Sequence, residues 1–218
     1  MKKNNKYIWF LLIIIFLTLL SRPTISVNEP FFNRKKIILM GDSMLKNNQY
    51  VKPKQSVEYL LKQKHSNTLI VAKDNSHIAN LPEQFNKIKS SIDKDTEIII
   101  SIGGNDILYY NQNKHINKYY YNRIDHLFTL FEKTIKKLFK DTKATVYFLN
   151  IYYPKSNAYK KYHNLISEWN QQLKMFTKKH KYHLIEVDKL FRHATDFTND
   201  IEPSYQGSKL LVHKILHL

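Results

Sequence analysis

The sequence predicts an α/β fold of the three-layer α/β/α type, in which helices cover both faces of a five-stranded parallel sheet. Five short runs of almost continuous apolar residues indicate strands that are buried on both faces, as the strands of a parallel sheet are. Between those runs apolar residues recur at helical spacing, so that strand and helix alternate along the chain. A chain of 218 residues, of which 43% are hydrophobic, suffices for one core.

The individual elements follow from local patterns. The predicted strands are Lys36–Met40, Thr68–Ala72, Thr96–Ile102, Ala144–Ile151 and His183–Val187. The predicted helices are one capped by Ser56 and running through His65, one with Pro82 in its first turn that carries Phe85, Ile88 and Ile92, two with apolar stripes over Ile124–Phe139 and Tyr162–Phe176, and one from about Gln206 to the C-terminus. With no repeat or linker in evidence, residues 35–218 are predicted to form one domain.

The first 26 residues have the features of an export segment. Three lysines precede Tyr7–Leu20, a run of 14 apolar or weakly polar residues, which is typical of a signal-peptide core and short for a membrane-spanning helix. Residues 1–26 are therefore predicted to be a signal peptide or an uncleaved anchor, and residues 27–34 a tether. Either way we expect a secreted or extracytoplasmic protein, with residues 7–20 as its membrane tether if the segment is retained.

The net charge of +17 suggests nucleic acid or anionic membranes as partners, but the composition argues against the first. Of the 35 basic residues only four are Arg, the residue that phosphate-binding sites favour, and removal of residues 1–26 would leave +13. We expect lysines on solvated faces and no nucleic-acid partner; binding to anionic envelope polymers stays open. The absence of Cys excludes thiol catalysis and Cys-ligated metals, and no metal or cofactor motif is present.

Two polar motifs follow predicted strands, at the edge where open α/β sheets carry their active sites. The first is Gly41-Asp42-Ser43, where a Ser on a tight strand-to-helix turn would expose its hydroxyl beside a helix start, as a nucleophile or as a simple helix cap. The second is Gly103-Gly104-Asn105-Asp106, in which the glycines let the backbone approach a ligand and the Asn amide suits an oxyanion. A plain turn that caps a helix is the alternative.

Together these motifs resemble those of the SGNH/GDSL hydrolase family. Ile151-Tyr152-Tyr153-Pro154 and Ile201-Glu202-Pro203-Ser204 resemble a bacterial subgroup of it, and the resemblance covers roughly Lys35 to Leu218. It implies a flavodoxin-like SGNH hydrolase fold and ester hydrolysis. Ser43 would be the nucleophile, its N–H and the Asn105 amide would be oxyanion donors, and Gly104 would allow that approach. We expect Asp42, Asp106 and His77 to lie at the site as binding residues.

Two positions depart from the family's pattern. Asn75 stands where the family has a Gly whose N–H completes the oxyanion hole, and Asn tolerates positive φ better than other non-Gly residues do. Glu202 stands where the family has its catalytic His, and Asn199 where it has the Asp that orients the His. Burial could raise the pKa of Glu202 toward 6–7 and make it a base. The alternatives are that Glu202 is a purely structural carboxylate, for example one that caps the last helix, or that His77 is the base.

The resemblance therefore implies an exported serine esterase. Its substrates would be small acyl esters, or O-acyl groups on envelope glycans or lipids. The alternative is a catalytically weak or inactive protein of the same fold, in which the pocket binds an acyl or glycan ligand because no competent base is present.

Overall fold

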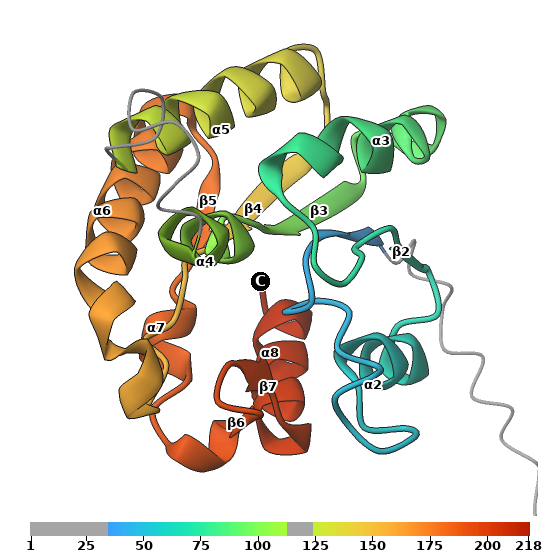
Figure 1. The fold of residues 1–218 in the computed structure, drawn as a ribbon. Helices are drawn as coiled ribbons and strands as arrows, with labels where there is room; N and C mark the ends of the chain where they lie inside the picture. Colours follow the sequence, from blue (N-terminus) through green and yellow to red (C-terminus); the bar gives the residue numbers. More distant parts are fainter. Residues whose placement is uncertain (1–34, 113–123) are drawn as a thin grey trace, which may run out of the picture. The chain divides into compact units, whose positions relative to one another are not determined.

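The computed structural model describes residues 35–112 and 124–218 of the chain (Figure 1). The predicted export segment, residues 1–26, and the predicted tether, residues 27–34, lie outside these described residues. Within them, no helix is both long enough and apolar enough to span a membrane.

A five-stranded sheet confirms the predicted fold class. Its strands are β1 (Lys36–Gly41), β2 (Thr68–Ile70), β3 (Thr96–Ser101), β4 (Thr145–Leu149) and β5 (His183–Ile185). All four pairings are parallel and the strand order is β2-β1-β3-β4-β5. The last four strands end one or two residues before the predicted ends, where the chain turns into the loops at the carboxyl edge of the sheet.

The helices are α2 (Val57–Lys64), α3 (Leu81–Asn86), α4 (Gly104–Gln112), α5 (Ile124–Phe139), α6 (His163–His180), α7 (Val187–Leu190) and α8 (Tyr205–Leu216). Short 3₁₀ turns are η1 (Ile78–Asn80), η2 (Lys89–Ser91), η3 (Asn157–Tyr162) and η4 (Ala194–Asp196). Ser56 caps α2 as predicted, since its side chain accepts a hydrogen bond from the Tyr59 N–H.

One predicted helix is too long. The segment with Pro82 in its first turn was expected to carry Ile88 and Ile92, but α3 ends at Asn86 and the chain tightens into η2. Both isoleucines still pack against the core, so the apolar spacing predicted their burial correctly. The backbone that carries them follows a 3₁₀ turn and not the predicted α-helix.

Each face of the sheet has its own core. Alternate strand side chains such as Ile38 and Met40 pack against α3, α4, α5 and α6, around the fully buried Trp169. Their neighbours Ile37 and Leu39 pack against α2, α7 and α8. Figure 1 shows these two groups of helices on opposite sides of the strands. Helices therefore cover both faces, and the polar loops gather at the strand ends.

A small hairpin precedes the last helix and was not predicted. It consists of β6 (Phe197–Thr198) and β7 (Glu202–Pro203), which pair antiparallel beside α8 (Figure 1). Asn199 and Asp200 at its turn both have positive φ, 39° and 72°, which Asn and Asp tolerate better than most residues.

Candidate active site

Ser43 lies on a tight turn immediately after β1. Gly41 ends that strand with φ at +117°, and the Asp42 N–H donates to the Ser101 carbonyl of β3 at 2.9 Å. The chain then closes a hydrogen-bonded turn, in which the Lys46 N–H donates to the Ser43 carbonyl at 3.1 Å. No helix starts here, because the next one is α2 at Val57, so the expected strand-to-helix turn and its helix dipole at Ser43 are wrong.

The Ser43 side chain has one hydrogen-bond partner, which comes from the other end of the chain. Ser43 Oγ donates to Glu202 Oε1 at 2.9 Å, and both side chains are more than nine-tenths buried. The alternative that Glu202 caps the last helix is wrong, because Ser204 is the N-cap of α8 and its hydroxyl accepts from the Gly207 N–H. Glu202 instead faces the turn that carries Ser43.

Burial changes the acidity of Glu202. It raises the pKa of this carboxyl to about 7, with the negative charge of Asp74 adding to the rise and the hydrogen bond from Ser43 opposing it. A Glu at its ordinary pKa of about 4.3 is a weak base at neutral pH. Glu202 is about half ionised near pH 7 and binds a proton far more readily than an exposed carboxylate does.

A second buried carboxyl lies beneath the same turn. Asp42 Oδ1 accepts from Ser101 Oγ at 2.7 Å and from the Met44 N–H at 3.2 Å. Burial raises the pKa of Asp42 to about 7, and the charge of Glu202 adds to that rise. These contacts point the Asp42 side chain at the backbone of the turn, so that it braces the turn while Glu202 contacts the hydroxyl.

The loop after β2 carries Asn75, which is exposed and does not line the pocket described below, and its next residue contacts Asn105. Asn75 has φ at +54°, the left-handed conformation that its replacement of Gly requires. The Asn105 amide donates to the Ser76 carbonyl at 3.0 Å and has a second N–H available to a ligand. Gln84 holds the loop from the other side, since its amide donates to Ser76 Oγ at 3.0 Å and to the Gly41 carbonyl at 2.9 Å.

A pocket opens beside Ser43 and Glu202. About 630 Å³ of space not filled by atoms lies between its walls, with the open solvent at its mouth included. Asp42, Gly104 and Asn105 line its polar end. The rest of the wall is mainly apolar and aromatic, with Ile107 and Leu108 from α4, Tyr152 after β4, Tyr159 and Tyr162 from η3, and Ile166 from α6.

Comparison with known proteins identifies the family of the chain. The family model described as GDSL-like lipase/acylhydrolase matches residues 37–212. The chain belongs to this family.

Several solved structures share its fold. A lipolytic protein of the G-D-S-L family from Veillonella parvula superposes with a TM-score of 0.66 at 19% identity, covering 84% of this chain and 97% of that one. A putative acylhydrolase from Bacteroides fragilis gives 0.64 at 14% identity, with coverages of 85% and 86%. An acetylxylan esterase from Geobacillus stearothermophilus gives 0.63 at 13%, with coverages of 84% and 93%. No curated protein matches the sequence.

A base in this GDSL-family chain would need to contact Ser43, but His77 contacts Asp106 instead. His77 Nδ1 lies 3.5 Å from Asp106 Oδ1, and this carboxylate raises the pKa of His77. Asp106 also accepts from the Ile78 N–H at 3.2 Å, which ties η1 to α4. The contacts of His77 do not include Ser43, and neither His77 nor Asp106 lines the pocket. The pair braces the loop that carries Asn75.

The two glycines before Asn105 differ. Gly103 has φ at +105°, and a Cβ there would lie 2.4 Å from the Trp169 ring, so this position requires Gly. Gly104, which was expected to provide the close approach, has no atom within 4 Å of the place of a Cβ and borders the pocket. Gly103 is therefore the position at which the backbone requires Gly, while Gly104 leaves open space beside the pocket.

Three residues of the site were missed from the sequence: Asn47, Gln84 and Tyr152. Each is a buried polar side chain that bonds to a loop backbone of the site. The signal for Asn47 was its position four residues after Ser43, and that for Gln84 was a polar residue on the buried side of a short helix. No group of three His, Asp or Glu side chains among residues 35–112 and 124–218 is arranged to hold a metal ion.

Proposed function

We propose that the chain is a serine esterase in which Ser43 is the nucleophile and Glu202 the general base. One observation carries the proposal: the 2.9 Å hydrogen bond from Ser43 Oγ to the Glu202 carboxylate, at the polar end of a pocket. Membership of the GDSL-like lipase/acylhydrolase family and the fold shared with an acetylxylan esterase support an ester-hydrolysing enzyme.

The chemistry follows from the contacts. Ionised Glu202 accepts the Ser43 proton while Oγ attacks the ester carbonyl carbon. The Ser43 N–H, the Asn105 amide and the Asn75 N–H would stabilise the resulting oxyanion. Glu202 then returns the proton to the leaving alcohol, which leaves an acyl group on Ser43. A water molecule gives a proton to Glu202 as its oxygen attacks this acyl group. Glu202 then passes that proton to Ser43 Oγ as the bond from Oγ to the acyl carbon breaks, so that the acid product leaves and Ser43 is restored.

The walls of the pocket suit the acyl half of the substrate. The proton must return to the leaving oxygen, so the alcohol lies on the Glu202 side and the acyl group lies toward α4 and α6. That end is formed by Ile107, Leu108 and Ile166, which suits a short apolar acyl chain. We propose small acyl esters, or O-acyl groups on envelope glycans or lipids, as substrates for an exported enzyme.

The test is hydrolysis of p-nitrophenyl acetate and butyrate. We expect activity that Ser43→Ala abolishes, and labelling of Ser43 by a fluorophosphonate. Glu202→Gln should lower kcat at least about 100-fold, since general-base catalysis contributes about 10²–10⁴-fold. Asp200→Asn is the matched control, because it removes an exposed carboxylate from the same hairpin and should leave kcat unchanged.

Activity should also fall as pH drops through about 7, where Glu202 becomes protonated. The esterase proposal is contradicted if hydrolysis is no faster than that of Ser43→Ala and Ser43 is not labelled. That result would favour a binding protein. Full activity of Glu202→Gln across pH 5–9 would remove Glu202 from the mechanism and leave Ser43 in place.

A further inference from the structure

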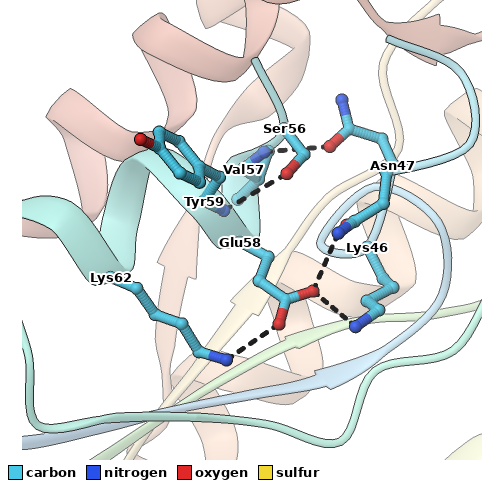
Figure 2. Close-up of polar contacts among 8 residues, drawn as sticks. Lys46, Asn47, Ser56, Val57, Glu58, Tyr59 and Lys62 are labelled. Atoms are coloured by element: carbon cyan, nitrogen blue, oxygen red, sulfur yellow. Dashed lines mark hydrogen bonds and ion pairs between the residues drawn. The ribbon is translucent and has the colours of Figure 1, made fainter. Parts of the chain in front are cut away.

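Asn47 lies in the segment that follows the nucleophile, four residues after Ser43, and its side chain is fully buried. Its amide oxygen accepts from the Val57 N–H at 2.9 Å, which joins this segment to the start of α2. Figure 2 shows the Asn47 oxygen facing Val57, next to the Ser56 cap. On the exposed side of the same turn, Glu58 pairs with Lys46 and, at 2.8 Å, with Lys62.

The nitrogen of the Asn47 amide contacts the segment that carries Glu202. It donates to the Pro203 carbonyl at 2.8 Å and to Ser208 Oγ of α8 at 2.8 Å. The Asn47 amide thus uses both N–H donors and its oxygen in hydrogen bonds. The Pro203 carbonyl belongs to the residue directly after Glu202, so one buried side chain links the two segments that supply the Ser43–Glu202 hydrogen bond.

Glu202 needs such a link because its strand gives little support. The strand β7 has two residues and pairs only with β6, outside the main sheet. An isolated two-stranded hairpin is marginally stable in water. Buried carboxylates also gain free energy by turning toward solvent, so a Glu202 without anchorage would leave Ser43.

We propose that Asn47 is a positioning residue, which holds the Glu202 carboxylate in reach of Ser43 by binding the Pro203 carbonyl. The proposal rests on the proposed function. Asn47 touches neither the substrate pocket nor the reacting oxygens, so its effect is exerted through the backbone of β7. A merely structural role, in which Asn47 only anchors α2 and α8, predicts different results.

The experiment compares Asn47→Ala with two matched controls. Ser208→Ala removes the other acceptor of the Asn47 amide and leaves the Pro203 contact. Ser56→Ala removes the cap of α2 beside Asn47. Should Asn47→Ala fail to fold, Asn47→Asp keeps the shape of the side chain and the acceptor for Val57, yet when ionised it cannot donate to Pro203. Each is assayed for kcat, KM, the pH profile and Tm.

We expect Asn47→Ala to lower kcat about 10- to 100-fold with KM within about threefold, because a misplacement of about 1 Å costs that much. The low-pH limb of activity should move from about 7 toward the ordinary Glu value of about 4.3, as Glu202 turns to solvent. Both serine variants should lower Tm and keep kcat and this limb. The titratable groups that face Glu202, which are Asp42, Asp74, Tyr50, Tyr152 and Tyr159, are unchanged in the alanine variants, whereas Asn47→Asp adds one carboxyl.

A carboxyl titration followed by carbon NMR, with Glu202→Gln to assign the signal, tests the same inference without any substrate. A lower Tm for Asn47→Ala with unchanged kcat and an unchanged Glu202 titration would overturn the inference, as would an equal effect of Ser208→Ala. If the unsubstituted protein shows no Ser43-dependent hydrolysis, the proposed function fails. The titration then still decides whether Asn47 holds Glu202 in its buried position.

Discussion

Ser43 and Glu202 meet in one hydrogen bond, but the backbone around each is built differently. Ser43 follows β1, an interior strand that pairs with β2 on one side and with β3 on the other. Glu202 lies on a strand of two residues that pairs only with β6. The nucleophile is thus placed by sheet hydrogen bonds and a glycine turn, whereas the proposed base is placed by side chains that reach it from elsewhere.

Those side chains come from three directions. Asn47 binds the Pro203 carbonyl, and the Tyr152 hydroxyl donates to the Ile201 carbonyl on the other side of Glu202. Asp196, at the end of η4, accepts the Arg192 and His193 N–H groups, and its carbonyl accepts the Ser204 N–H. The difference predicts that changes around Ser43 act mainly on folding, while changes around Glu202 act mainly on catalysis.

The largest effect is expected at Gly41. A Cβ there would lie 1.8 Å from the Ser101 carbonyl oxygen, and φ at +117° is strained for any L side chain. Gly41→Ala must push β1 from β3, so we expect a loss of about 4 kcal/mol or more of unfolding free energy, or no folded protein. Denaturant unfolding measures it, with Gly104→Ala as the control that meets no atom within 4 Å. Equal stability of the two variants would contradict the rigid turn.

The second-largest expected effect is on the pH dependence of stability, where the contribution of Asp42 can be told apart from that of Glu202. The pKa of Asp42 is about 7 in the folded protein and about 3.9 in an unfolded chain. A raised folded pKa means that the folded state binds the proton more tightly. This contribution to stability is therefore complete below about pH 4 and is lost as pH rises through 7, on the order of 3 to 4 kcal/mol.

Glu202 contributes in the same direction, since its pKa is also about 7. We expect the free energy of unfolding to fall between pH 4 and 8, and Asp42→Asn to remove about half of that fall. Denaturant unfolding at several pH values measures both slopes, and Asp200→Asn, at an exposed site, should keep the original slope. An identical slope in Asp42→Asn would show that Asp42 is not the buried acid described above.

The same comparison explains how far the sequence could predict this site. The strand cores were predictable because apolar runs are local signals, whereas the Gly41-Asp42-Ser43 turn alone left a helix cap open and indicated a nucleophile only through the family resemblance. The positive φ of Asn75 also followed from that resemblance, because Asn75 aligns with a Gly of the family. The Ser43–Glu202 contact joins residues 159 positions apart, and only the family resemblance suggested it.

The residues that hold Glu202 left weak local signals, since for Asn47 the signal was only its position four residues after Ser43. Asn47 and Tyr152 act through hydrogen bonds to backbone carbonyls 156 and 49 residues away, and any polar side chain in a loop looks alike in a sequence. The expected helix start at Ser43 failed for a related reason. A Ser after a strand is typical of helix caps, but here the turn is closed by its own backbone and the chain reaches α2 only at Val57.

The smallest effect on stability, with a clear effect on catalysis, is expected at Tyr152. Tyr152→Phe keeps the ring that packs against Phe191 and Phe197 and removes only the hydroxyl that binds the Ile201 carbonyl. The loss of one such hydrogen bond costs about 1 kcal/mol. Because Ile201 precedes Glu202 directly, kcat should fall several-fold beyond what the loss of folded protein explains, with the low-pH limb shifted downward.

The neighbouring residue supplies the control for this change. Tyr153 packs its ring against His163 and against the core on the other face of the sheet from Tyr152, so Tyr153→Phe makes the same chemical change without touching Ile201. Compared with Tyr153→Phe, Tyr152→Phe should lose about 1 kcal/mol of unfolding free energy, have a lower kcat and show a shifted acid limb in its pH profile. If Tyr152→Phe lowers Tm and leaves kcat and the acid limb unchanged, then Tyr152 stabilises the fold alone, and the positioning of Glu202 depends on the Asn47 side of β7.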